Sequence, residues 1–90
     1  SIMTKESIMT MTKAYVLIET AVGKSRQVTE QLSELDGVIT VDSVTGPYDI
    51  IAVVTAPDLS TIGHVVSQKI HTINGIVRTV TCLVVTSLSE

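Results

Sequence analysis

Residues 44–54, VTGPYDIIAVV, decide the fold of this chain. The Gly46-Pro47 pair is a turn signal that separates two apolar segments, VITVDSVT (38–45) and YDIIAVVTA (48–56). Because the turn joins these segments almost directly, we expect them to pair as an antiparallel β-hairpin. The second strand of the hairpin opens with Tyr48 and Asp49, a phenol and a carboxylate at the start of an otherwise apolar core strand.

A strand and a helix are predicted before the hairpin. The segment AYVLIE (14–19) has the composition of a strand, since β-branched and aromatic side chains favour extended backbone. Residues 24–35 have the apolar spacing of a helix, which Gly37 follows as a stop signal. The residues on the apolar face of this helix are Val28, Leu32 and Leu35.

A second helix and a last strand are predicted after the hairpin. Asp58 is placed to cap the free amides of the helix, and residues 76–88 have the pattern of a strand. The apolar face of the second helix comprises Leu59, Ile62, Val66 and Ile70. The order β-α-β-β-α-β with right-handed crossovers predicts an α+β, ferredoxin-like fold, a four-stranded antiparallel sheet with both helices on one face.

Both faces of this sheet are predicted to be apolar, although two helices can cover only one of them. Alternating residues point to opposite faces of a strand. The opposed sets are Ile50, Ala52 and Val54 against Ile51 and Val53; Val80, Cys82 and Val84 against Leu83 and Val85; Val16 and Ile18 against Tyr15 and Leu17. Monomers rarely expose a continuous apolar surface of more than a few hundred Å². We therefore expect a dimer in which two sheets face one another.

Composition restricts the functional class. Ninety residues make one domain, which we place at 13–90, and the repeated SIMT in residues 1–12 indicates a leader or an extension. A net charge of −3 and the absence of a run of Lys or Arg argue against direct nucleic-acid binding. Cys82 has no partner for an internal disulfide, and no segment has the length of a membrane span, so a cytoplasmic location is expected.

Catalytic and metal-binding patterns are absent from the sequence. His64 and His71 are seven residues apart without a Cys or carboxylate at ligand spacing, and no nucleophile motif or phosphate-binding glycine loop occurs. The sequence therefore predicts neither an enzyme nor a cofactor.

The turn at Gly46, Pro47, Tyr48 and Asp49 has two interpretations. In the structural one, Asp49 bonds to backbone amides and Tyr48 covers the edge of the sheet. In the functional one, the turn is the wall of a ligand site, and Asp49 offers a carboxylate to an ammonium group. Donors and hydroxyls for the rest of an amino acid could then come from the last strand, which carries Arg78, Thr79 and Thr81.

Three segments together resemble the C-terminal ligand-binding (RAM) domain of the Lrp/AsnC, or feast/famine, transcriptional regulators: VTGPYDIIAVV, APDLSTIGHVV and INGIVRTVTCLVV. The matching motifs are Gly-x-[Tyr/Phe]-Asp at 46–49, Pro-Asp-Leu at 57–59 and Gly-[Val/Ile]-x-x-Thr-x-Thr at 75–81. The resemblance covers about 14–88. It implies dimers through facing sheets, octamers or similar rings, and amino acids as effectors bound between dimers. In the site it implies, Gly46, Tyr48 and Asp49 are joined by Thr79 and Thr81 of a neighbouring dimer.

The chain also departs from the family pattern. Full-length relatives carry a helix-turn-helix domain before this one, whereas twelve or thirteen residues precede the first strand here. Pro47 replaces a residue that is polar or acidic in many relatives and removes an amide donor. The sequence therefore predicts a stand-alone amino-acid-binding and oligomerisation module that forms homo-oligomers and assembles with full-length relatives. The alternatives are a dimeric α+β-barrel enzyme, with His64 in its cavity, and a structural or ACT-like oligomeriser.

Overall fold

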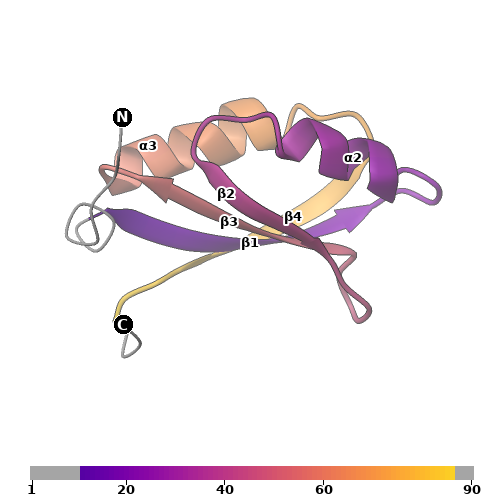
Figure 1. Cartoon of the computed structure of the whole chain (residues 1–90), viewed down its shortest axis with the longest axis horizontal. Helices are drawn as coiled ribbons and strands as arrows, with labels where there is room; N and C mark the ends of the chain where they lie inside the picture. The colour runs from indigo at the N-terminus through magenta and orange to yellow at the C-terminus, as the bar shows by residue number, and fades with distance from the viewer. Residues whose placement is uncertain (1–10, 87–90) are drawn as a thin grey trace.

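A computed structural model describes residues 11–86 and shows two layers, a sheet and a pair of helical segments that lie on one of its faces (Figure 1). The element order β-α-β-β-α-β and the antiparallel sheet confirm the predicted ferredoxin-like fold. The strands lie side by side in the order β2-β3-β1-β4. The elements are β1 (Thr12–Thr20), α2 (Ser25–Leu32), β2 (Val38–Ser43), β3 (Ile50–Ala56), α3 (Leu59–His64), η1 (Val65–Ile70) and β4 (Ile76–Leu83).

The core lies between the sheet and the helices and is almost entirely aliphatic. Strand β3 alternates buried and half-buried residues over its whole length, because successive side chains point to opposite faces. The same alternation in β1 sends Val16 and Ile18 toward the helices, where both are fully buried. The helical segments contribute Val28, Leu32, Ile62, Val66 and Ile70 to this core.

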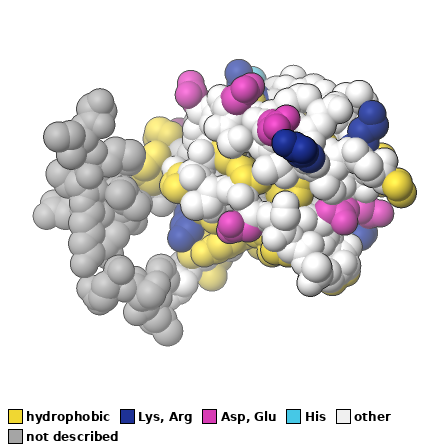
Figure 2. All heavy atoms as spheres, turned by 45° about the vertical axis from the view of Figure 1, so that its right-hand side comes forward, with side chains coloured by type: hydrophobic (Ala, Val, Ile, Leu, Met, Phe, Trp, Pro, Cys, Tyr) yellow, Lys and Arg dark blue, Asp and Glu magenta, His cyan; other side chains and the backbone are white. Residues whose placement is uncertain are grey.

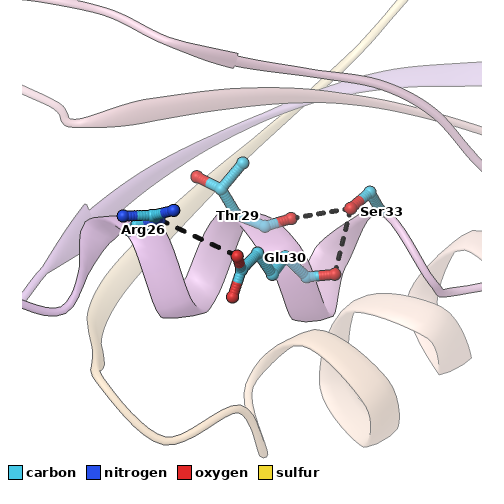
Figure 3. Close-up of polar contacts among 4 residues, drawn as sticks. All are labelled: Arg26, Thr29, Glu30 and Ser33. Carbon is cyan, nitrogen blue, oxygen red and sulfur yellow. Dashed lines mark hydrogen bonds and ion pairs between the residues drawn. The ribbon is translucent and has the colours of Figure 1, made fainter.

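The first helix ends earlier than the sequence predicts, at Leu32 rather than residue 35. The hydroxyl of Ser33 donates to the carbonyl oxygens of Thr29 and Glu30, each at 3.0 Å (Figure 3). The Glu30 carbonyl accepts from this hydroxyl, whereas the Glu34 amide, which would continue the helical ladder, bonds to Gln31 instead. The expected apolar face is nevertheless present, since Leu35 packs against the core from the turn that follows.

The second helical segment begins and ends as predicted, at Leu59 and Ile70, but its second half is wound differently. The Asp58 carboxylate accepts from the Thr61 amide at 2.8 Å, which confirms the cap. Leu59 is 58% exposed, so its assignment to the buried face was wrong. Helical side chains point toward the N-terminus, and that of a first-turn residue therefore projects past the start of the helix. From Val65 to Ile70 the backbone is wound as a π-helix.

The hairpin strands are shorter than predicted, and their connection is longer. Strand β2 ends at Ser43 and β3 begins at Ile50, so residues 44–49 form the turn. The Val44 amide closes this turn by donating to the Asp49 carbonyl at 2.9 Å. Residues 1–10 of the expected leader, and residues 87 and 88 of the expected last strand, lie outside the described part of the chain.

The face of the sheet opposite the helices, here called the open face, is apolar as predicted. Register places Leu17 of β1 between Ile51 of β3 and Val80 of β4 on this face. Tyr15, Val53 and Cys82 extend the same surface, and Tyr15 and Val80 are 39% and 37% exposed. The open face is polar only toward its margins. Within residues 11–86, no helix has the length and apolar character that a membrane span requires.

Candidate functional site

The turn formed by residues 44–49 is fastened to the end of β1 through Asp49. The Asp49 backbone amide donates to the Ile18 carbonyl at 2.9 Å. Its carboxylate oxygen Oδ2 accepts from the Thr20 amide at 2.8 Å and from the Thr20 hydroxyl at 3.3 Å. The Thr20 hydroxyl also lies 2.6 Å from that of Ser25, the first residue of α2. This arrangement confirms the structural interpretation of Asp49, whose other oxygen, Oδ1, has no hydrogen bond to any described residue.

Tyr48 reaches the opposite side of the sheet from Asp49. The Arg78 guanidinium lies over its ring, with Cζ 5.2 Å from the ring centroid, a cation–π geometry. Arg78 Nε also lies 3.4 Å from Glu19 Oε1, because Arg78 and Glu19 are directly opposite one another on β4 and β1. The adjacent Tyr48 and Asp49 therefore attach the turn to β4 on the open face and to the end of β1 on the other side. These two attachments explain why a polar pair precedes this core strand.

The rest of the turn is open to solvent. Gly46 has a φ of +154°, and a Cβ added there would meet nothing within 4 Å. Pro47 is exposed, and Ser43, Val44 and Thr45 line a shallow, open depression beside it. The turn and the β1–α2 connection lie at the same end of the sheet in Figure 1. Figure 2, in which this end comes forward, shows acidic and basic side chains interspersed across the surface. A ligand here would need a second surface to enclose it.

The structure places Thr79 and Thr81 away from Arg78. Thr79 is opposite Ile18 and Thr81 is opposite Val16, and these core residues point toward the helices. Arg78 points the other way because neighbouring residues of a strand alternate. The Thr79 hydroxyl instead bonds to Nε2 of His71, the residue that follows η1. One chain thus gathers Gly46, Pro47, Tyr48, Asp49 and Arg78 into a cluster at one end of the sheet, with Tyr48 and Arg78 on the open face and Asp49 on the other side. The two threonines point away from Arg78 and do not join it.

Two further residues contact this cluster and were not predicted: Glu19, which pairs with Arg78, and Thr20, which bonds to Asp49. Their only signal in the sequence is their position at the end of the first strand, and the contacts depend on a strand register that spacing alone does not define. The register shifts between them, so that Glu19 pairs with Arg78 and Thr20 with Ile76. Alternation along β1, in which Ile18 faces the helices, sends the Glu19 side chain to the open face and that of Thr20 to the helix layer.

A metal site and the placement of His64 in a cavity receive no support from the geometry of residues 11–86. In that part of the chain, no three His, Cys, Asp or Glu side chains are grouped as a metal site would require. His64, the residue on which the barrel-enzyme alternative depends, is exposed to solvent.

The comparisons with known proteins identify the family. The Lrp/AsnC ligand binding domain matches residues 13–90. An uncharacterised helix-turn-helix-type transcriptional regulator of Pyrococcus furiosus is 32% identical over 65 residues, which are 72% of this chain and 43% of the relative. The chain thus spans less than half the length of this relative.

Solved structures agree with this assignment. The protein TTHA0845 of Thermus thermophilus is 36% identical and superimposes with a TM-score of 0.84, over 89% of this chain and all of that one. A transcriptional regulator of Neisseria meningitidis, solved as a complex with L-methionine, shares the fold at 14% identity (TM-score 0.84, 100% of this chain and 60% of that one). The resemblance predicted from the sequence is confirmed, and this chain belongs to the Lrp/AsnC ligand-binding domain family.

Proposed function

We propose that this regulatory domain binds a free α-amino acid, or a closely related small metabolite, at the cluster formed by the 44–49 turn and Arg78. The observation that carries the proposal is the arrangement of charges at this exposed end of the sheet. Arg78 supplies a guanidinium that can bind a carboxylate, and Asp49 supplies a carboxylate with one oxygen that is not hydrogen-bonded within residues 11–86. Because these two side chains point to opposite sides of the sheet within one chain, a single ligand would take them from two copies in contact. A zwitterion requires one group of each kind. The Neisseria relative, solved with L-methionine, supports an effector of this class.

The proposed working unit is an assembly of several copies. The open face carries apolar side chains on three adjacent strands, and a second copy placed sheet against sheet would bury them. Larger rings such as octamers, and mixed assemblies with other Lrp/AsnC proteins, would bring further surfaces to the exposed turn. Thr79 and Thr81 would then join the site from a neighbouring copy, since within one chain they lie on the other face of the sheet from Arg78.

In this proposal the effector acts by changing the populations of assemblies. An effector bound where copies meet shifts the equilibrium only by the difference in its affinity for the two assemblies. The regulatory output is therefore oligomer size, which ligand titration at fixed protein concentration should alter.

Calorimetric titration of the twenty amino acids into the wild type and an Asp49→Asn variant tests the site. An asparagine can still accept from the Thr20 amide, so the variant removes the charge while it keeps the anchor. We expect Asp49→Asn to weaken binding by about 1–3 kcal/mol, as when a hydrogen bond to a charged group is lost. Asp42→Asn is the matched control, because Asp42 is an exposed carboxylate of β2 outside the cluster. Equal affinity of the wild type and Asp49→Asn would remove Asp49 from the site.

A purely structural oligomeriser is the second candidate, and the shallowness of the depression at Ser43, Val44 and Thr45 favours it. It predicts an assembly whose size responds to none of the twenty amino acids. The same titrations, repeated with light scattering, decide between the two candidates.

A further inference from the structure

The Glu19–Arg78 ion pair lies at the margin of the open face, beside the turn. We propose that this pair is an exchangeable receptor for a zwitterion: it opens when an amino acid binds, so that Arg78 takes the ligand carboxylate and Glu19 takes the ligand ammonium group. The inference rests on the proposed function and assigns to Glu19 a binding role that the turn motif does not include.

The Arg78 side chain has two partners but remains accessible to solvent. Its guanidinium is held by one contact from Nε to Glu19 Oε1, at 3.4 Å, and by the Tyr48 ring beneath it. The two side chains remain 59% and 42% exposed for Arg78 and Glu19 respectively. A guanidinium has five N–H donors, so much of its capacity to bind a carboxylate through two parallel bonds stays available.

The existing pair is easy to replace. Exposed ion pairs with a single contact contribute little to stability, because water screens the charges and the side chains lose freedom when they pair. A ligand carboxylate that meets the guanidinium with two oxygens makes the stronger interaction. Tyr48 keeps the guanidinium in place during the exchange, since its contact is with the face of the group rather than its edge.

Once their ion pair has opened, Glu19 and Arg78 together should bind an amino acid more tightly than a simple carboxylate. An acid without an amine would satisfy Arg78 but leave the displaced Glu19 carboxylate beside the bound one, and like charges repel. The ammonium group of an amino acid lies next to its own carboxylate and can pair with Glu19. Within one chain the Asp49 carboxylate is turned to the other side of the sheet from Arg78, so Glu19 is the acceptor beside the guanidinium, and it has no other ion-pair partner within residues 11–86.

Glycine and acetate are the probes, because they differ by the amine alone. The readout is the Nε–Hε signal of Arg78 in ¹H–¹⁵N spectra, and Arg26, the other arginine of the chain, is an internal control. Arg26 forms a comparable exposed pair with Glu30, at 3.8 Å on α2 (Figure 3). The full chain is titrated as the wild type, Glu19→Gln and the matched control Glu30→Gln at constant ionic strength, with sedimentation confirming equal assembly.

In the wild type and in Glu30→Gln, glycine should shift the Arg78 signal at a lower concentration than acetate. Glu19→Gln should reverse this order. It should lower the affinity for glycine and raise the affinity for acetate by about two- to fivefold each, the range that an exposed ion pair contributes. The Arg26 signal should not discriminate between the probes. The inference is overturned if glycine and acetate act equally on the wild type, or if Glu19→Gln leaves their ratio unchanged.

These outcomes separate the inference from the proposed function. Tight amino-acid binding in calorimetry together with an unchanged ratio in Glu19→Gln would retain the function and refute the receptor role of Glu19. The reversed ratio at millimolar probe concentrations, with no amino acid bound tightly enough for calorimetry, would establish the charge exchange at Arg78 and refute a tight amino-acid effector.

Discussion

Replacing Gly75 by alanine tests how closely the start of β4 packs against α2. Gly75 has a φ of +105°, and its carbonyl accepts from the Ala21 amide at 2.8 Å. An added Cβ would lie 2.8 Å from Lys24 Cβ and 3.1 Å from Val28 Cγ2. Lys24 Cβ is bonded directly to the backbone, and Val28 is fully buried, so neither atom can move away without shifting the helix.

The cost can be estimated from its parts. A left-handed backbone costs a residue with a Cβ about 1–2 kcal/mol. Alanine lowers the entropy of the unfolded chain, which offsets about 0.4–1 kcal/mol of that. Forcing an extra carbon into a packed contact costs about 1–3 kcal/mol. Gly75→Ala should therefore lower the free energy of unfolding by about 3 kcal/mol, within a range of about 1–4.5 kcal/mol.

Gly23→Ala is the matched control. Gly23 has a φ of +78°, but an added Cβ would meet nothing within 4 Å, so this variant measures the backbone cost alone, about 1 kcal/mol. Urea unfolding followed by circular dichroism, at several protein concentrations because association stabilises the fold, gives both values. If Gly75→Ala were no less stable than Gly23→Ala, the close approach of β4 to α2 would be refuted.

Two further predictions concern the helix cap and the open face. The side-chain and backbone hydrogen bonds from Thr61 lower the pKa of Asp58 below its ordinary value of 3.8, so the stability they contribute is present above that pH and is lost as pH falls through the folded-state pKa. Asp58→Ala should therefore lower Tm at neutral pH by a margin that shrinks in acid; a margin independent of pH in thermal melts would exclude this role. On the open face, Leu17→Lys should shift sedimentation toward smaller species, whereas Gln31→Lys, at an exposed position of α2 on the other side of the sheet, should not. Unchanged sedimentation of Leu17→Lys would rule out association through this face.

The features that depend on alternation could be read from the sequence. Ile50 and Ile51 belong to opposite faces in any strand, so the apolar character of both faces followed once the strands were located. The same rule assigns Arg78 and Thr79 to opposite faces of β4, which means that a single chain cannot bring both side chains to one site. The helical spacing assigned Leu59 to the buried face, although the residue is exposed, because spacing does not show where a helix begins relative to the sheet.

The features that depend on register could not be predicted. The Glu19–Arg78 pair joins residues far apart in the sequence, and a one-residue slip between β1 and β4 would send one of them to the other face. The pairing of Asp49 with Thr20 likewise depends on the register of β1 against β3, which places the turn beside the end of β1. The π-helical segment has no pattern of its own, since Val65 and Val66, which are both buried, also fit an ordinary helix.

The positions of the two tyrosines allow intrinsic fluorescence to report on the surface of this protein. Tyr15 and Tyr48 are the only aromatic residues of the chain, and each lies under a cation, Lys13 and Arg78 respectively. All intrinsic near-ultraviolet absorption and emission therefore arise outside the aliphatic core, from the sheet surface and its adjoining turn. A change in tyrosine fluorescence on dilution or on addition of a metabolite would thus report events at those two places without a label, against a core that emits nothing.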